Sequence, residues 1–120
     1  MKPRIEQTHF GSITIEGVVF PHDVIIRLDG QVKKRKKKLS KAVHGTSHIL
    51  SLAEAQQVYE KGAEGVIIRS GQQGMVVLSD RAAAYFAQQH CAVHLGPTPA
   101  AIQRWNQTKG VLIGLFHVTC

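Results

Sequence analysis

The sequence lacks the features that mark most secreted and membrane-bound proteins. Its 120 residues include only two cysteines, Cys91 and Cys120, too few for the disulfide framework of a small secreted protein. The longest apolar run, VLIGLF at residues 111–116, is far shorter than the roughly 20 residues of a membrane-spanning helix. The amino terminus has neither the apolar stretch of a signal peptide nor the long Arg-rich run of a transit peptide. We therefore expect a soluble, cytoplasmic protein that has no membrane partner.

The chain has no acidic residue in its most highly charged segment. Lys and Arg number 15 and Asp and Glu number 8, so the formal net charge is 15 − 8 = +7. Residues 33–41, KKRKKKLSK, contain seven of the basic residues, and the eight basic and eight acidic residues elsewhere cancel. The excess charge is therefore that of one patch. Since 43% of the residues are hydrophobic, the composition is that of an ordinary globular protein, and the length predicts a single domain spanning residues 1–120.

The first third of the chain is typical of β-hairpins. Apolar residues between Ile13 and Phe20 flank the turn pair Glu16-Gly17, and a β-branched run from Val24 is closed by Asp29-Gly30, a strong hairpin signal. The extended segment after this turn would contain the basic run, with lysine or arginine on both faces. Because neither face can then be dry, we expect this hairpin to project from the core or to lie at a sheet edge.

The remaining two thirds alternates between helical and strand patterns. Ser51 and Glu54 fit a capping box that begins a helix of about three turns ending near Gly62. Further helices are predicted after Ser79 and after Thr98-Pro99, and short strands at residues 65–69, 91–95 and 111–118. This alternation predicts an α/β fold with βαβ units. We expect a three-layer domain whose central mixed sheet, formed by the N-terminal hairpins and C-terminal parallel strands, is flanked by helices.

The basic run and the segment that follows it are the first candidate site. Lys34, Arg35, Lys36 and Lys38 would supply positive charge to an acidic partner, and Gly45, Thr46, Ser47 and His48 would supply backbone and side-chain hydrogen bonds to an anion. Two plainer interpretations stay open. The lysines would protect a solvated edge strand from pairing, and Thr46 and Ser47 would satisfy local backbone groups in a turn.

A second candidate pocket comprises Arg69, Gly71, Gly74, His117 and Cys120, because open α/β sheets bind ligands at strand ends. It is not a dinucleotide loop, since Arg69 replaces the first glycine of that motif and an apolar run follows where a helix is needed. The pairs Ser47 with His48 and His117 with Cys120 are weak candidates for nucleophilic catalysis, so the catalytic residues stay unknown. His90-Cys91-x-x-His94 and His117-x-x-Cys120 are each only part of a zinc site, and we expect neither a metal nor a cofactor.

Several stretches in a fixed order resemble one protein family over nearly the whole chain. They are HFG, SITIEG and HDVIIRLDG near the start, GTSHILSLAEA at residues 45–55, then SGQQG, LSD, PTPAAI and the terminal HVTC. The family is the small domain shared by a mitochondrial complex I assembly factor, an adipogenesis-associated animal protein and stand-alone prokaryotic proteins of unknown function, which this chain resembles most. Arg69 stands where these proteins usually carry glycine. The resemblance implies a one-domain α/β fold, assembly or interaction roles, and no established catalytic activity.

Three functions follow as expectations. The first is a non-enzymatic binding or assembly protein that presents the basic hairpin and the neighbouring GTSH loop to an acidic protein or a small anion. The second is a nucleic-acid binder that uses phosphate contacts alone, because the basic run contains no aromatic residue on which a base would stack. The third is an enzyme or sensor for a small anionic metabolite.

Overall fold

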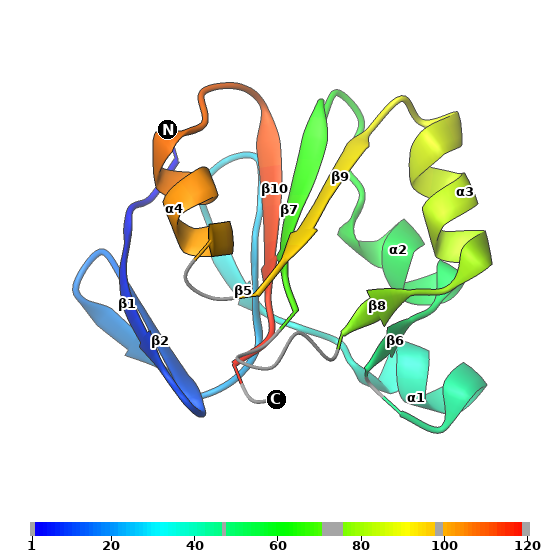
Figure 1. Cartoon of the computed structure of the whole chain (residues 1–120), viewed down its shortest axis with the longest axis horizontal. Coiled ribbons are helices and arrows are strands. Elements are labelled where there is room, and N and C mark those ends of the chain that lie inside the picture. The colour runs from blue at the N-terminus through cyan, green and yellow to red at the C-terminus, as the bar shows by residue number, and fades with distance from the viewer. Residues whose placement is uncertain (1, 47, 71–75, 98–99, 119–120) are drawn as a thin grey trace.

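The centre of the molecule is a five-stranded mixed sheet, seen in a computed structural model that describes residues 2–46, 48–70, 76–97 and 100–118 (Figure 1). The strand order is β5-β4-β10-β7-β9. Their bounds are β4 (Val24–Ile26), β5 (Val32–Lys34), β7 (Gly65–Arg69), β9 (Ala92–Gly96) and β10 (Leu112–Phe116). Strands β10, β7 and β9 run parallel, whereas β4 and β5 form an antiparallel hairpin beside β10. The predicted mixed sheet with parallel C-terminal strands is confirmed.

Helices and short strands cover both faces of this sheet (Figure 1). One face carries α2 (Leu52–Val58) and α3 (Asp80–Gln88), with α1 (Lys38–His44) packed on α2 and a two-stranded sheet of β6 (Ile49–Leu50) and β8 (Val77–Leu78). The other carries α4 (Ala100–Gln107) and a three-stranded sheet of β1 (Ile5–His9), β2 (Ser12–Ile15) and β3 (Val18–Phe20). The α/β class and the three-layer arrangement are therefore confirmed.

Successive residues of the central strands supply two separate hydrophobic cores. In β7, Val66 and Ile68 pack toward α2 and α3, while Ile67 packs toward α4 and the three-stranded sheet. This alternation is what a strand buried on both faces requires. Trp105 of α4 is fully buried against Phe116, with ring centroids 5.8 Å apart. No helix among the described residues is long and apolar enough to cross a membrane.

The predicted turns and helix caps that depend on neighbouring residues are present. The hairpins at Glu16-Gly17 and Asp29-Gly30 form, and the Ser51 and Ser79 hydroxyls accept hydrogen bonds from helix amides at the starts of α2 and α3. The first hairpin, however, belongs to its own three-stranded sheet and does not join the central one. The cap predicted at Thr98-Pro99 lies outside the described residues.

Two further predictions are wrong. Helix α2 ends at Val58, with Tyr59 as its C-cap, and so is shorter than predicted. The basic run does not stay extended either, because β5 ends at Lys34 and α1 begins at Lys38. In α1 the buried Ser40 faces inward and donates hydrogen bonds to Ser51 and Glu54. The helix ends at Gly45, whose φ of 71° suits glycine.

Candidate functional site

Four charged or titratable side chains meet where neighbouring central strands begin or end. Asp23 precedes β4, Arg35 follows β5, Arg69 ends β7 and His117 follows β10. The register brings them together, since Phe116 pairs with both Val24 and Arg69. This is the carboxyl end of the parallel strands, the end at which open α/β sheets bind ligands.

Arg35 is the centre of this cluster. It is only 3% exposed, and its Nε and Nη2 donate to the two carboxylate oxygens of Glu54 at 2.5 and 3.0 Å. Its Nη1 donates to Asp23 Oδ2 at 3.0 Å. Burial by itself would lower the pKa of the guanidinium, but Glu54 and then Asp23 stabilise its charge and raise that pKa above its ordinary value. The charge of Arg35 is therefore neutralised inside the protein, and the prediction that Arg35 presents its charge to a partner is wrong.

Asp23 connects Arg35 to the end of β10. Its Oδ2 lies 2.7 Å from Nδ1 of His117, and its Oδ1 accepts the Val118 amide at 2.9 Å. Burial would raise the pKa of this carboxyl group, but the hydrogen bonds from His117 and Val118, together with the charge of Arg35, lower it to about 2. Asp23 is therefore ionised throughout the physiological range.

Two members of the second predicted pocket do lie together. Arg69 is fully buried, and its Nη1 donates to the backbone oxygen of His117. Burial lowers the pKa of Arg69, and the charge of Asp23 partly opposes this. The other members, Gly71, Gly74 and Cys120, lie outside the described residues.

Glu54 is held in place by two serines as well as by Arg35. Its backbone amide donates to Ser51 Oγ at 3.1 Å, which is the predicted N-cap. Its carboxylate does not return to the Ser51 amide as the capping box predicted, because it turns inward to Arg35 and accepts from Ser40 Oγ. The Ser51 amide donates instead to Ser40 Oγ at 2.9 Å. Helices α1 and α2 are thus joined through the polar cluster.

The GTSH loop makes intramolecular contacts in the described residues. Thr46 Oγ1 accepts the His48 amide at 3.1 Å, which is the local turn contact of the plainer interpretation. The His48 ring stands edge-on to that of His117, with centroids 5.5 Å apart. Gly45 is the C-cap of α1, and Ser47 lies outside the described residues. The structure therefore brings His48, from the first predicted site, to His117, from the second.

Asp23, Glu54 and Ser40 were not predicted from the sequence as members of this cluster. A signal existed for Glu54, because it lies four residues before Val58 and so shares the buried face of α2. No comparable signal marks Asp23 or Ser40, whose partners lie far along the chain.

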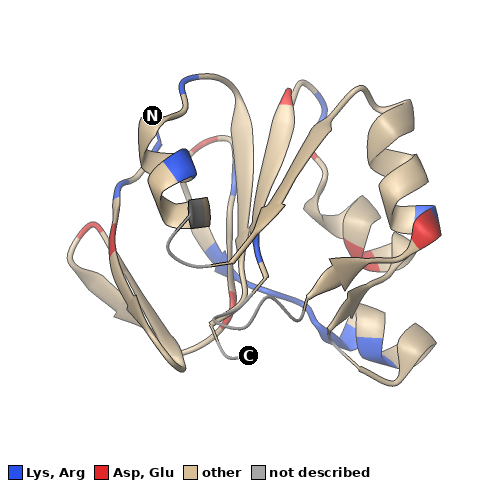
Figure 2. Cartoon of the chain, viewed as in Figure 1, with Lys and Arg blue, Asp and Glu red and all other residues tan. Residues whose placement is uncertain are grey.

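The lysines around the buried Arg35 are exposed to solvent. We refer to residues 33–41 as the lysine segment. All six of its lysines are exposed: Lys33, Lys34, Lys36, Lys37, Lys38 and Lys41. Figure 2 shows this basic stretch running from β5 into α1. It begins at β5, the edge strand predicted for the basic hairpin. A small pocket of about 210 Å³ lies beside it, lined by Lys34, Lys37 and His22 together with the buried Asp23 and Arg35.

The described residues contain no group of three or more His, Cys, Asp or Glu side chains arranged to hold a metal ion. His94 instead lies 3.4 Å from Nη1 of Arg104 through its Nδ1, and Cys91 is buried in the core between the sheet and α3. Burial raises the pKa of the Cys91 thiol, which makes it a poor nucleophile.

Comparison with known proteins places the chain in a family. No family model and no curated protein matches it. Among solved structures, a conserved hypothetical protein of Pyrococcus horikoshii OT3, PH1505, is 28% identical with a TM-score of 0.88, covering 98% of this chain and 99% of its own. The structure of MT938 is 30% identical with a TM-score of 0.82, covering 99% and 100%. A Bordetella pertussis protein described as a Mth938-like domain shares the fold at 13% identity and a TM-score of 0.63, covering 97% and 85%.

The fold and the comparisons together define a small α/β protein. Its similarity to PH1505 and MT938 extends over essentially the whole length of each chain. The chain belongs to the family of MT938.

Proposed function

We propose that this protein is a cytoplasmic, non-enzymatic binding or assembly protein whose lysine segment contacts an acidic surface on a partner protein. One observation carries the proposal: all six lysines of the segment are exposed, whereas its single arginine is buried against two carboxylates. The exposed charge has no acidic residue within the segment to neutralise it, so an anionic partner relieves its self-repulsion.

The anchoring of Arg35 supports this function. Its backbone amide donates to the Asp23 carbonyl at 3.0 Å, and its side chain is held by Glu54 and Asp23. The lysines on either side of it are therefore presented from a fixed backbone, which lowers the entropy that a partner must remove on binding. An assembly role agrees with the resemblance to a family that includes a complex I assembly factor.

A small anion is the second candidate ligand, and the pocket of about 210 Å³ beside the segment favours it. Lys34 and Lys37 line this pocket together with His22, all of which can donate to phosphate or carboxylate oxygens. The GTSH loop stays a separate candidate for the anion, because its described residues do not line this pocket and His48 contacts the ring of His117 instead. Nucleic acid is the third candidate, and only through its phosphates, since the segment contains no aromatic side chain.

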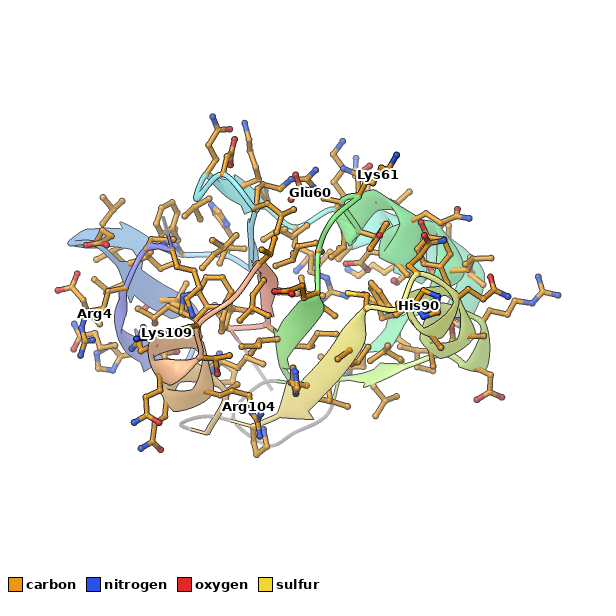
Figure 3. The ribbon with its side chains drawn as sticks, turned by 90° about the horizontal axis from the view of Figure 1, so that it is seen from above. Arg4, Glu60, Lys61, His90, Arg104 and Lys109 are labelled. Carbon is orange, nitrogen blue, oxygen red and sulfur yellow. The ribbon has the colours of Figure 1, made fainter. Side chains whose placement is uncertain are left out.

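The test measures binding to a polyglutamate peptide, to duplex and single-stranded oligonucleotides and to inorganic phosphate across a salt series. The variant Lys34→Gln/Lys36→Gln/Lys38→Gln, called the triple glutamine variant below, removes three charges from the segment. The control variant, Lys61→Gln/Arg81→Gln/Lys109→Gln, removes three exposed charges outside it. Figure 3 shows Lys61 beside the end of α2 and Lys109 beside α4. Both variants have the same net charge, so any difference in their binding reflects where on the protein the charges were removed.

Polyglutamate binding that the triple glutamine variant loses and the control keeps would support the proposal. Affinity capture of partners should then show the same difference. If every captured partner stays bound to the triple glutamine variant, the segment is not the binding surface. Tighter binding to duplex DNA than to polyglutamate, with a log-log salt slope near ~0.9 per phosphate contacted, would overturn the protein-partner proposal in favour of nucleic acid. A phosphate-dependent rise in melting temperature without polyglutamate binding would favour the small anion.

A further inference from the structure

The two edges of the central sheet differ in charge. At one edge, β5 carries the exposed Lys33 and Lys34, and charged side chains on an edge strand discourage pairing with another chain. At the other edge, β9 has the uncharged sequence AVHLG from Ala92 to Gly96. Among the described residues no strand pairs with the far side of β9. Only one of the two edge strands therefore carries charged side chains of its own, and the nearest described charge beside β9 is Arg104 of α4, which contacts His94.

The hydrogen bonds between β9 and β7 show which backbone groups of β9 point outward. The Ala92 amide donates to the Glu64 carbonyl, and the Gly96 carbonyl accepts the Ser70 amide. In a parallel pair alternate residues bond to the neighbouring strand, so Ala92, His94 and Gly96 face β7. The amides and carbonyls of Val93 and Leu95 consequently point away from the sheet, ready to pair with an added strand.

An apolar groove of about 800 Å³ lies beside this edge, on the α3 face. Among the residues that line it are Val77, Leu78, Ala83, Ala87, Val93 and Leu95. Val77 and Leu95 are 46% and 45% exposed, and both line this one groove. A strand that paired with β9 would cover both.

We propose that this edge is the interface with a second copy of the chain, formed by antiparallel pairing of the two β9 strands about a two-fold axis at His94. In this register Val93 of each copy faces Leu95 of the other, so both outward-pointing residues of each strand find hydrogen-bonding partners. The apolar groove of each copy would then be covered at the shared edge.

The position of the lysine segment leaves this edge open to a second copy of the chain. A chain of net charge +7 resists self-association wherever its basic surface must meet itself. Here the lysine segment starts at β5, at the opposite edge of the sheet from β9. Figure 3 shows the β4–β5 hairpin and β9 on opposite sides of the molecule. Pairing through β9 therefore keeps the two lysine segments apart and leaves both accessible.

Sedimentation equilibrium over a concentration series tests the proposal. The wild-type chain should form a dimer, and Leu95→Lys or Val77→Lys should weaken dimerisation about tenfold or more, because each places a charge in the covered groove. Val19→Lys is the matched control, since Val19 is 59% exposed on β3, and it should leave the dimer unchanged. Circular dichroism would check that each variant folds. A wild-type chain that stays monomeric to about 1 mM overturns the proposal and leaves the groove to an extended peptide.

A cross-link tests the register. In the proposed pairing the two His94 residues form a non-hydrogen-bonded pair with Cα atoms about 4.5 Å apart, close enough for a disulfide. His94→Cys in a Cys120→Ser background should therefore give a covalent dimer on mild oxidation, whereas Val19→Cys in that background should not. A dimer that His94→Cys does not cross-link would overturn this geometry. The triple glutamine variant should dimerise normally, so this proposal and the proposed function can fail separately.

Discussion

Replacing Glu54 with glutamine should destabilise the protein through the buried charge of Arg35. Glu54 is fully buried, and its carboxylate accepts two hydrogen bonds from Arg35 and one from Ser40. Removing one partner of a buried ion pair costs about 3–5 kcal/mol, because the other charge is left uncompensated. Since Asp23 still holds Nη1 of Arg35, we expect the lower end, about 3 kcal/mol. For a chain of 120 residues this lowers the melting temperature by about 12 °C.

Urea denaturation provides the assay, with the fluorescence of the buried Trp105 and far-ultraviolet circular dichroism as two probes. Glu60→Gln is the matched control, because Glu60 forms a partly exposed ion pair with Arg27 at 3.4 Å and should cost less than about 1 kcal/mol. A loss below about 1 kcal/mol for Glu54→Gln, or equal losses for the two variants, would refute the conclusion that Arg35 depends on Glu54.

Three further measurements follow from the structure. The pKa of Asp23 is lowered to about 2 from 3.8, so its ionisation contributes about 2 kcal/mol of stability that is present above pH ~5 and lost as the pH falls toward 2. The urea midpoint measured against pH should show this loss. In the Asp23→Asn variant this part of the pH dependence should be absent. The triple glutamine variant should melt at a higher temperature than the wild type at low salt, because like charges are removed, and a difference that persists in about 1 M salt would contradict this explanation. Gly114→Ala should cost about 1–3 kcal/mol in urea denaturation, because its Cβ would lie 2.5 Å from Phe116 and 3.0 Å from Trp105. Gly96→Ala is its control and should change stability by less than about 0.5 kcal/mol, since a Cβ there meets nothing within 4 Å; equal losses would show that the contact does not matter.

The parts of the fold that depend on local chemistry were predictable from the sequence. Asp29-Gly30 defines its hairpin and Ser79 its helix start because neighbouring residues satisfy these backbone groups. Helix α1 was not predicted because Ser40 is its only buried side chain, so the helix has no periodic row of buried apolar residues to mark it in the sequence.

The candidate site was only partly predictable, for a related reason. His117 and Arg69 were found because they end predicted strands, and strand ends meet at one edge of a sheet. The burial of Arg35 was not visible in a run of basic residues, because its carboxylate partners lie 12 and 19 residues away along the chain. Periodicity cannot detect contacts over such distances, and only the assembled sheet brings these residues together.

The buried Arg35 and the exposed lysines around it should respond differently to substitution. Arg35 anchors the segment that carries the exposed lysines, so that segment cannot detach from the sheet without exposing the Asp23 and Glu54 carboxylates. A variant that weakens the anchor would loosen this internal segment between β5 and α2 without changing its charge. Under the proposed function, the loosened segment would still attract an acidic partner at long range, but it would release that partner sooner. A variant of the buried anchor would therefore mainly raise the dissociation rate, whereas a variant of the exposed lysines would mainly lower the association rate.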